Sequence, residues 1–249
     1  INREALIDEV LHGHGIPIHN PVPPGFVAVE SQDTPTLNSV NDSRLAQAAA
    51  ILEDGGWKKN ENGVWEKEID EETVSLRVAV STANTPLFDQ TATHIQKTWE
   101  DLGVIVSVEQ YEQTDLVQAI IRPRSFEALL FGNDIGRSVD LYPFWHSSQK
   151  DDPGLNIAQF TSIDADALLE SAREAEDEAS RVEAITDFAN LAATERPALF
   201  LFTPTFSYVM DKDVTVSNLG KLSTPSERFA NIAQWHMSAD ALWPVFNSR

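Results

Sequence analysis

Apolar residues in the middle of the chain follow first a strand spacing and then a helix spacing. Residues 74–80 alternate apolar with polar or small side chains, which predicts a strand with one apolar face. Residues 92–102 repeat apolar side chains at helical spacing, which predicts an amphipathic helix that ends at Gly103. Further strands are expected at 104–108 and 126–131, with a short helix at 116–121 between them. This alternating order predicts an α/β lobe with at least part of its sheet parallel.

Other predicted elements flank this lobe on both sides. A helix at 2–11 precedes a proline-rich surface crossing at residues 17–24. A second helix, capped by Asn41-Asp42-Ser43, ends at Gly55-Gly56 and leads into a hairpin that turns at Asn62-Gly63. After an irregular stretch, the pattern predicts helices at 163–175 and 178–194, a strand at 199–202 and a loop-rich tail at 207–249.

Composition narrows the classes of partner. The 249 residues include 39 Asp or Glu and 18 Lys or Arg, which gives a formal charge of −21. Surfaces that bind nucleic acid or anionic lipid need clustered Lys and Arg, so this balance argues against both. The absence of cysteine excludes disulfides, thiolate metal sites and cysteine nucleophiles. No cofactor is expected, because neither a P-loop nor a dinucleotide-binding fingerprint occurs.

The chain begins Ile1-Asn2-Arg3-Glu4, without an initiating Met or a secretory signal. It also has no apolar run long enough to span a membrane. We therefore expect an excised fragment, with any export signal or lipid anchor lying upstream.

Catalytic and metal-binding patterns are weak. Ser147-Ser148 beside His146 is not expected to form a nucleophile and base, because adjacent residues rarely orient that way and no G-x-S-x-G elbow occurs. The three histidines His12, His14 and His19 have no evident further ligands at a fitting spacing, so no metal site is predicted. We expect a binding module and not an enzyme.

Several segments, in order along almost the whole chain, match a known pattern. They are Ile1–Ile7, Leu52–Trp57, Trp99–Val104, Phe126–Gly132, Asp140–Ser148, Asp164–Leu169 and Arg228–Trp235. Together these segments resemble the family 5 bacterial extracellular solute-binding proteins. That family includes the oligopeptide-, dipeptide- and nickel-binding components of ABC importers.

The resemblance implies two α/β lobes around a cleft, the periplasmic-binding-protein-like type II fold. Residues 1–205 would form the second lobe, a mixed sheet flanked by helices. Residues 206–249 would form a C-terminal return segment towards the missing first lobe. The apolar side chains of that segment, including Trp235 and Trp243, would then lack their native partners. We therefore expect the chain alone to bind solute weakly or not at all.

For function, the resemblance implies the substrate-binding component of an ABC importer, located at the cell surface as a lipoprotein or in the periplasm. The solute would by default be an oligopeptide, and the other partners would be the permease subunits and the missing lobe. Two alternatives stay open. One is the ligand-sensing domain of a transcriptional regulator, and the other is a receptor of the same fold for sugars or metal chelates.

The resemblance also implies a ligand face in the loop from Gly132 to Asn156. Solutes at the carboxyl ends of sheet strands meet loop backbone and short polar side chains. Asp134 is the first candidate to receive a peptide α-ammonium group, and Phe131 stands near where peptide binders often carry Trp. The expected ligand residues are Phe131, Asn133, Asp134, Asp140, Trp145, His146 and Asn156.

Each of these side chains also has a structural alternative. Asp134 would cap a turn, Trp145 would pack in an aromatic cluster, and Asn156 would bond loop backbone. His146 would cap the end of a helix. Solvent exposure is the expectation for Arg122 and Arg124, and contact with a ligand carboxylate is the alternative.

Overall fold

A three-stranded parallel sheet lies at the centre of the computed structural model, which describes residues 1–22, 24–25, 40–136, 138–216, 222 and 224–237. Its order is β6 (Ile105–Tyr111), β5 (Arg77–Ala83), β7 (Ala128–Leu130), with β5 in the middle. Both pairings are parallel. The parallel sheet predicted from the alternating order of elements is therefore confirmed.

Helix α3 (Pro86–Leu102) connects β5 to β6 and covers the sheet. Its N-cap is Thr85, whose side chain accepts from the Phe88 amide, and it ends at Gly103 in the left-handed conformation. The buried face of α3 carries Ala92 and Ile95, which pack against apolar side chains of all three strands. The predicted amphipathic helix is thus confirmed, with an earlier start.

The predicted short helix after β6 is also present, but in an unusual form. A single turn, α4 (Gln113–Asp115), runs into the π-helix η1 (Leu116–Ile121). The wider π-helical turn places residues five positions apart on one side. Leu116 and Ile121 therefore both pack against Ala83 at the end of β5.

A separate antiparallel sheet of β2 (Lys58–Lys59), β3 (Trp65–Ile69) and β4 (Glu72–Ser75) follows α2 (Val40–Asp54). The single strand predicted at 74–80 is wrong, because the chain changes partner at Leu76. The Leu76 amide donates to the Trp65 carbonyl, and the Leu76 carbonyl accepts from the Ile105 amide. Strands β4 and β5 therefore belong to different sheets, although they follow each other directly in the sequence.

Two glycine positions and one tryptophan attach this hairpin to α3. Trp65 is 1% exposed, and its Nε1 donates to the Leu102 carbonyl over 2.7 Å. Its backbone amide donates to the Gly103 carbonyl over 3.1 Å. A Cβ on Gly103 would lie 2.3 Å from the Gly63 carbonyl oxygen. Trp65 thus satisfies carbonyls that the end of α3 leaves free, and Gly103 permits the close approach.

The β3–β4 turn at the tip of the hairpin uses positive φ at both central residues. Asp70 and Glu71 have φ of 51° and 69°. Two-residue hairpin loops of the type I′ need this conformation at both positions, and glycine or asparagine is the usual solution. The tip lies at the amino end of β5, so it faces away from the edge where the parallel strands end.

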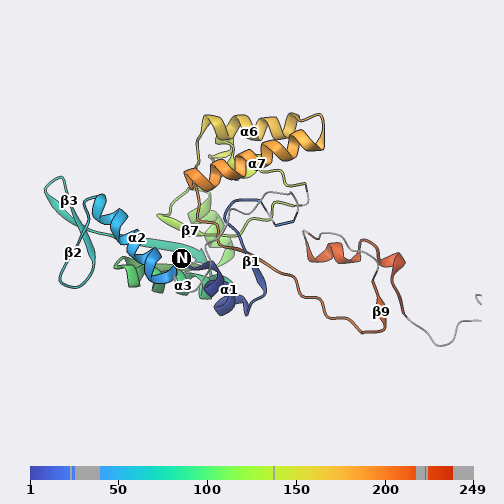
Figure 1. Ribbon diagram of the computed structural model, residues 1–249, viewed down its shortest axis with the longest axis horizontal. Coiled ribbons are helices and arrows are strands. Elements are labelled where there is room, and N and C mark those ends of the chain that lie inside the picture. Colours follow the sequence, from blue (N-terminus) through green and yellow to red (C-terminus); the bar gives the residue numbers. More distant parts are fainter. Residues whose placement is uncertain (23, 26–39, 137, 217–221, 223, 238–249) are drawn as a thin grey trace, which may run out of the picture.

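Two antiparallel helices form a second layer. They are α6 (Ile163–Glu174) and α7 (Glu178–Glu195), which lie side by side in Figure 1 and confirm the predicted pair. Ser162 and Asp177 provide their N-caps. The short helix α5 (Tyr142–Trp145) and the 3₁₀ turn η2 (Ser147–Gln149) pack beneath α6. Core side chains shared by these helices include Trp145, Leu169, Ile185 and Phe188.

The ends of the lobe meet in a short antiparallel pair. Helix α1 (Arg3–Leu11) leads to β1 (Gly15–Pro17), which pairs with β8 (Phe202–Pro204). The strand predicted at 199–202 begins later, and Leu199 is 51% exposed. Pro23, part of the predicted crossing, lies outside the described residues. No helix within the described ranges has the length and apolar character needed to cross a membrane.

Beyond β8 the chain runs away from the two layers (Figure 1). It contains β9 (Val214–Thr215), η3 (Pro225–Phe229), η4 (Ile232–Gln234) and β10 (His236–Met237). The Arg228 guanidinium lies over the ring of Phe229 at 4.1 Å and over that of Tyr208 at 4.8 Å. Trp235 joins the same aromatic group. A boundary at residue 205 stays a prediction, and Trp243 lies outside the described residues.

We predict that Gly103→Ala destabilises the chain more than Gly63→Ala. Both residues have positive φ, 106° and 79°. A side chain at either position costs about 1–2 kcal/mol of backbone strain. Only at Gly103 does the new methyl group also meet a carbonyl oxygen, which adds about 1–3 kcal/mol. Urea unfolding measures both losses of stability, and equal losses would contradict the close junction described above.

Candidate functional site

The order of the parallel strands defines a candidate binding edge. The chain passes from β5 to β6 on one side, and then crosses back to β7 on the other side of β5. Ligands of open parallel sheets bind at the carboxyl ends of the strands, where this reversal occurs. Here that point lies between Asn84, after β5, and the segment Phe131–Asp134, after β7. We call the latter segment the ligand loop.

The ligand loop presents its side chains to solvent. Phe131 is 43% exposed, and both Asn133 and Asp134 are exposed. One carboxylate oxygen of Asp134 accepts from the Gly136 amide over 3.0 Å. The turn-capping role considered for Asp134 is therefore present, and ligand contact by these three residues stays a prediction.

Polar residues that the sequence analysis missed lie along the same edge. Asn84 Nδ2 donates to Glu112 Oε1 over 3.1 Å, which joins the ends of β5 and β6. Glu109 accepts from the Tyr111 hydroxyl over 2.9 Å, and this bond raises the pKa of Tyr111. Asn84 and Glu112 each directly follow a strand of the parallel sheet, so their positions in the sequence could have predicted that they lie at this edge. The edge is polar and carries several carboxylates.

Trp145 and Asn156, also expected at the ligand face, are instead enclosed. Trp145 is 6% exposed and meets Phe200 edge-on at 5.6 Å between ring centroids. Asn156 is fully buried, and its Nδ2 donates to the carbonyls of Trp145, His146 and Phe160. Its Oδ1 accepts from the Phe160 amide over 3.1 Å. This burial gives both side chains a structural role and does not support direct contact with solute.

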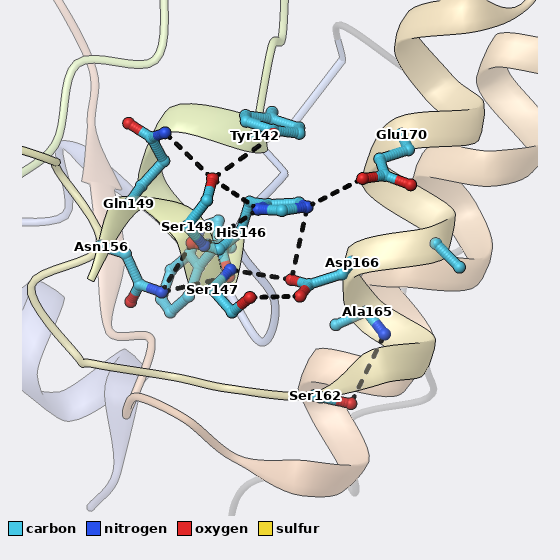
Figure 2. Close-up of polar contacts among 12 residues, drawn as sticks. Tyr142, His146, Ser147, Ser148, Gln149, Asn156, Ser162, Ala165, Asp166 and Glu170 are labelled. Atoms are coloured by element: carbon cyan, nitrogen blue, oxygen red, sulfur yellow. Dashed lines mark hydrogen bonds and ion pairs between the residues drawn. The ribbon is translucent and has the colours of Figure 1, made fainter. Parts of the chain in front are cut away.

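His146, itself buried, lies at the centre of a network of polar side chains that includes the exposed Ser148 and Glu170 (Figure 2). Its Nδ1 accepts from the Ser148 amide over 3.1 Å, and its Nε2 lies 3.3 Å from Glu170 Oε1. Ser148 Oγ lies 2.8 Å from the same Nδ1. The expectation that this pair does not form a nucleophile and base stays a prediction. His146 also stacks on Tyr142. The capping role considered for His146 is present, at the start of η2.

Asp140 also has protein partners. It forms a two-bond ion pair with Arg173, at 3.0 and 2.5 Å, and this pairing raises the pKa of Arg173. A hollow of about 310 Å³ adjoins this pair, lined partly by Leu169, Ile185 and Phe188. Those three side chains are at most 3% exposed, whereas Tyr142 and Leu168 in the same lining are partly exposed.

Arg124 stabilises the far end of the expected ligand face. Its guanidinium donates to the carbonyls of Ile121 and Gly154, over 2.6 and 2.8 Å. A Cβ on Gly154 would lie 2.2 Å from the Gln149 carbonyl oxygen, so this tight approach depends on glycine. Arg124 therefore binds backbone carbonyls of two segments. Arg122 forms an ion pair at the surface with Asp152 over 3.6 Å.

The described residues contain no group of three or more His, Asp or Glu side chains placed to hold a metal ion.

We predict that Asn156→Asp costs about 3 kcal/mol of stability or more. The change keeps the shape but replaces a donor to three carbonyls with a buried carboxylate oxygen. The exposed Asn133→Asp is the control and should stay within about 0.5 kcal/mol of the parent. Urea unfolding at neutral pH distinguishes them. A stable Asn156→Asp variant would contradict the structural role given to Asn156.

We also predict that neutral His146 carries its proton on Nε2. A backbone N–H donates to Nδ1, so Nδ1 must offer a lone pair, and the Nε2 proton can then point to Glu170. The ¹⁵N chemical shifts of the imidazole report the tautomer directly. A proton on Nδ1 would refute this assignment of the network.

Known proteins share both the sequence pattern and the fold. The model of the bacterial extracellular solute-binding proteins, family 5 (middle part), matches residues 1–154. Protein XP55 of Streptomyces lividans is 24% identical over 217 residues, which cover 84% of this chain and 37% of that protein.

Solved structures of binding proteins have the same fold. AppA, the oligopeptide-binding protein of Bacillus subtilis in complex with a nonapeptide, gives a TM-score of 0.71 at 22% identity. The match covers 96% of this chain and 46% of AppA. NikZ of Campylobacter jejuni, in complex with Ni(L-His), gives 0.69 at 19% identity over 94% of this chain and 46% of its own.

The chain thus spans less than half the length of these relatives. The expected periplasmic-binding-protein-like α/β fold is confirmed. Because the family match extends over more than half of its residues, the chain belongs to the bacterial extracellular solute-binding proteins of family 5.

Proposed function

We propose that this chain is one lobe of the solute receptor of an ABC importer, and that the solute binds at the ligand loop. The observation that carries the proposal is the exposed ligand loop at the point where the parallel strand order reverses. In this role the lobe makes and breaks no bond. It holds solute against a second lobe, and closure of the two presents the solute to the permease.

A peptide with a free amino group fits this edge best. Asp134 and Glu112 are exposed carboxylates, and the amides of Asn84 and Asn133 add donors and acceptors nearby along the edge. A carboxylate and an α-ammonium group form a strong charge-assisted hydrogen bond. The structural relative AppA holds a nonapeptide, which supports the same class of solute here.

A metal chelate is the second candidate, because NikZ holds Ni(L-His). Since the described residues offer no metal-ligating cluster, such a chelate would be held through its organic ligand and by shape. The two candidate solutes differ in one measurable property, because a metal chelate needs no free peptide amino group for binding.

The segment from residue 206 onwards is proposed to contact the other lobe. Several of its large apolar side chains are exposed, among them Phe206, Val209, Ile232 and Met237. Exposed apolar side chains gathered in one segment mark a contact surface. The proposal also places the receptor outside the cytoplasm, as the family description indicates.

We expect the full-length receptor to bind penta-alanine, and to bind N-acetyl penta-alanine at least tenfold more weakly, because acetylation removes the ammonium charge. Asp134→Asn should weaken binding of the free peptide by roughly tenfold and leave the acetylated peptide unaffected. Asp151→Asn, at another exposed carboxylate, is the matched control.

Isothermal titration calorimetry measures these affinities, with the nickel–histidine complex as a parallel probe. The chain of residues 1–249 alone should bind weakly or not at all. Silence towards every probe would refute the receptor role. Wild-type affinity in Asp134→Asn would instead refute only the placement of the ammonium group.

A further inference from the structure

We propose that Thr82 is a positioning residue for the ligand loop, a role that rests on the proposed function. Thr82 lies in β5 and is fully buried. It cannot touch a solute at the edge, because no part of it reaches solvent. Any effect on binding must therefore pass through a group that it holds in place.

That group is the backbone carbonyl of Leu130. Thr82 and Leu130 form the last paired position of β5 and β7. The Thr82 hydroxyl donates to the Leu130 carbonyl oxygen over 3.1 Å. Because the peptide group is planar, fixing this oxygen also fixes the amide nitrogen of Phe131. The bond thus sets the direction in which the ligand loop leaves the sheet.

The rest of the ligand loop has few other restraints among the described contacts. Phe131, Asn133 and Asp134 are exposed. A Cβ on Gly132 would lie 3.5 Å from Phe88 Cζ, and Asp134 caps the turn at Gly136. A loop held mainly at its first peptide group depends on that point for its orientation. Solute binding is sensitive to small misplacements of the groups that grip it.

Thr91, in the helix α3 that covers the sheet, provides a matched comparison. It is also fully buried, and its hydroxyl donates to the Leu87 carbonyl over 2.7 Å. That bond joins two residues of α3, so its loss should not change the path of the ligand loop. Thr82→Val and Thr91→Val each remove one buried hydroxyl at nearly constant volume, so general destabilisation affects both.

In the full-length receptor, Thr82→Val should raise the dissociation constant for penta-alanine roughly tenfold. Thr82→Ser keeps the hydroxyl and should bind within about twofold of the parent. Thr91→Val should lower the melting temperature but leave the dissociation constant unchanged. The backbone amide chemical shifts of Phe131, Asn133 and Asp134 should change in Thr82→Val and stay at the parental values in Thr91→Val.

Parental affinity and parental loop chemical shifts in Thr82→Val would overturn the proposal. Equal loss of affinity in Thr82→Val and Thr91→Val would also overturn it, since the effect would then be general destabilisation. If the unmodified receptor binds no probe, the proposed function fails, and the chemical shifts of the ligand loop still decide whether Thr82 orients it. If Thr82→Val does not fold, Thr82→Ala takes its place, and Thr82→Ser, which keeps the hydroxyl, should have the parental chemical shifts in the ligand loop.

Discussion

Because β5 pairs in parallel with β6 on one side and with β7 on the other, all three strands end at one edge of the sheet. Every segment that follows a strand must leave from there. Asn84, Glu112 and the ligand loop are gathered by this constraint alone, although they are far apart in sequence. Helix α3 then covers the sheet, and the π-helix packs against Ala83 at the carboxyl end of β5. The candidate site therefore depends on strand direction before it depends on any single side chain.

Polar side chains replace regular structure in the stretch from Asp140 to Phe160. Asn156 holds three carbonyls, His146 bridges a backbone amide and a helix carboxylate, and Arg124 holds the loop that ends at Gly154. Buried polar groups stabilise only when they are satisfied, so each of these side chains specifies one path of the backbone. The stretch is irregular in secondary structure but closely defined in its hydrogen bonds.

Local spacing along the sequence was enough to locate most helices and two of the three parallel strands, whereas the ligand face was expected from the family resemblance and stays a prediction. Local spacing failed where the bounds of a strand or the role of a side chain depended on partners distant in the sequence. The alternation at 74–80 continues through Leu76, although the chain changes partner there. The Trp145 side chain meets Phe200, and Asp140 meets Arg173, so neither of these distant partners was visible in the neighbouring residues. The missed Asn84 and Glu112 lacked any motif and were marked only by following a strand.

The turn at Asp70-Glu71 has a practical consequence. It is exposed, lies at the amino end of β5, and is separated from the ligand loop by the full length of the sheet. The Trp65–Gly103 junction fixes the base of the hairpin independently of its tip. An affinity tag or a fluorescent label attached at this tip would therefore lie at the opposite end of the sheet from the candidate ligand loop.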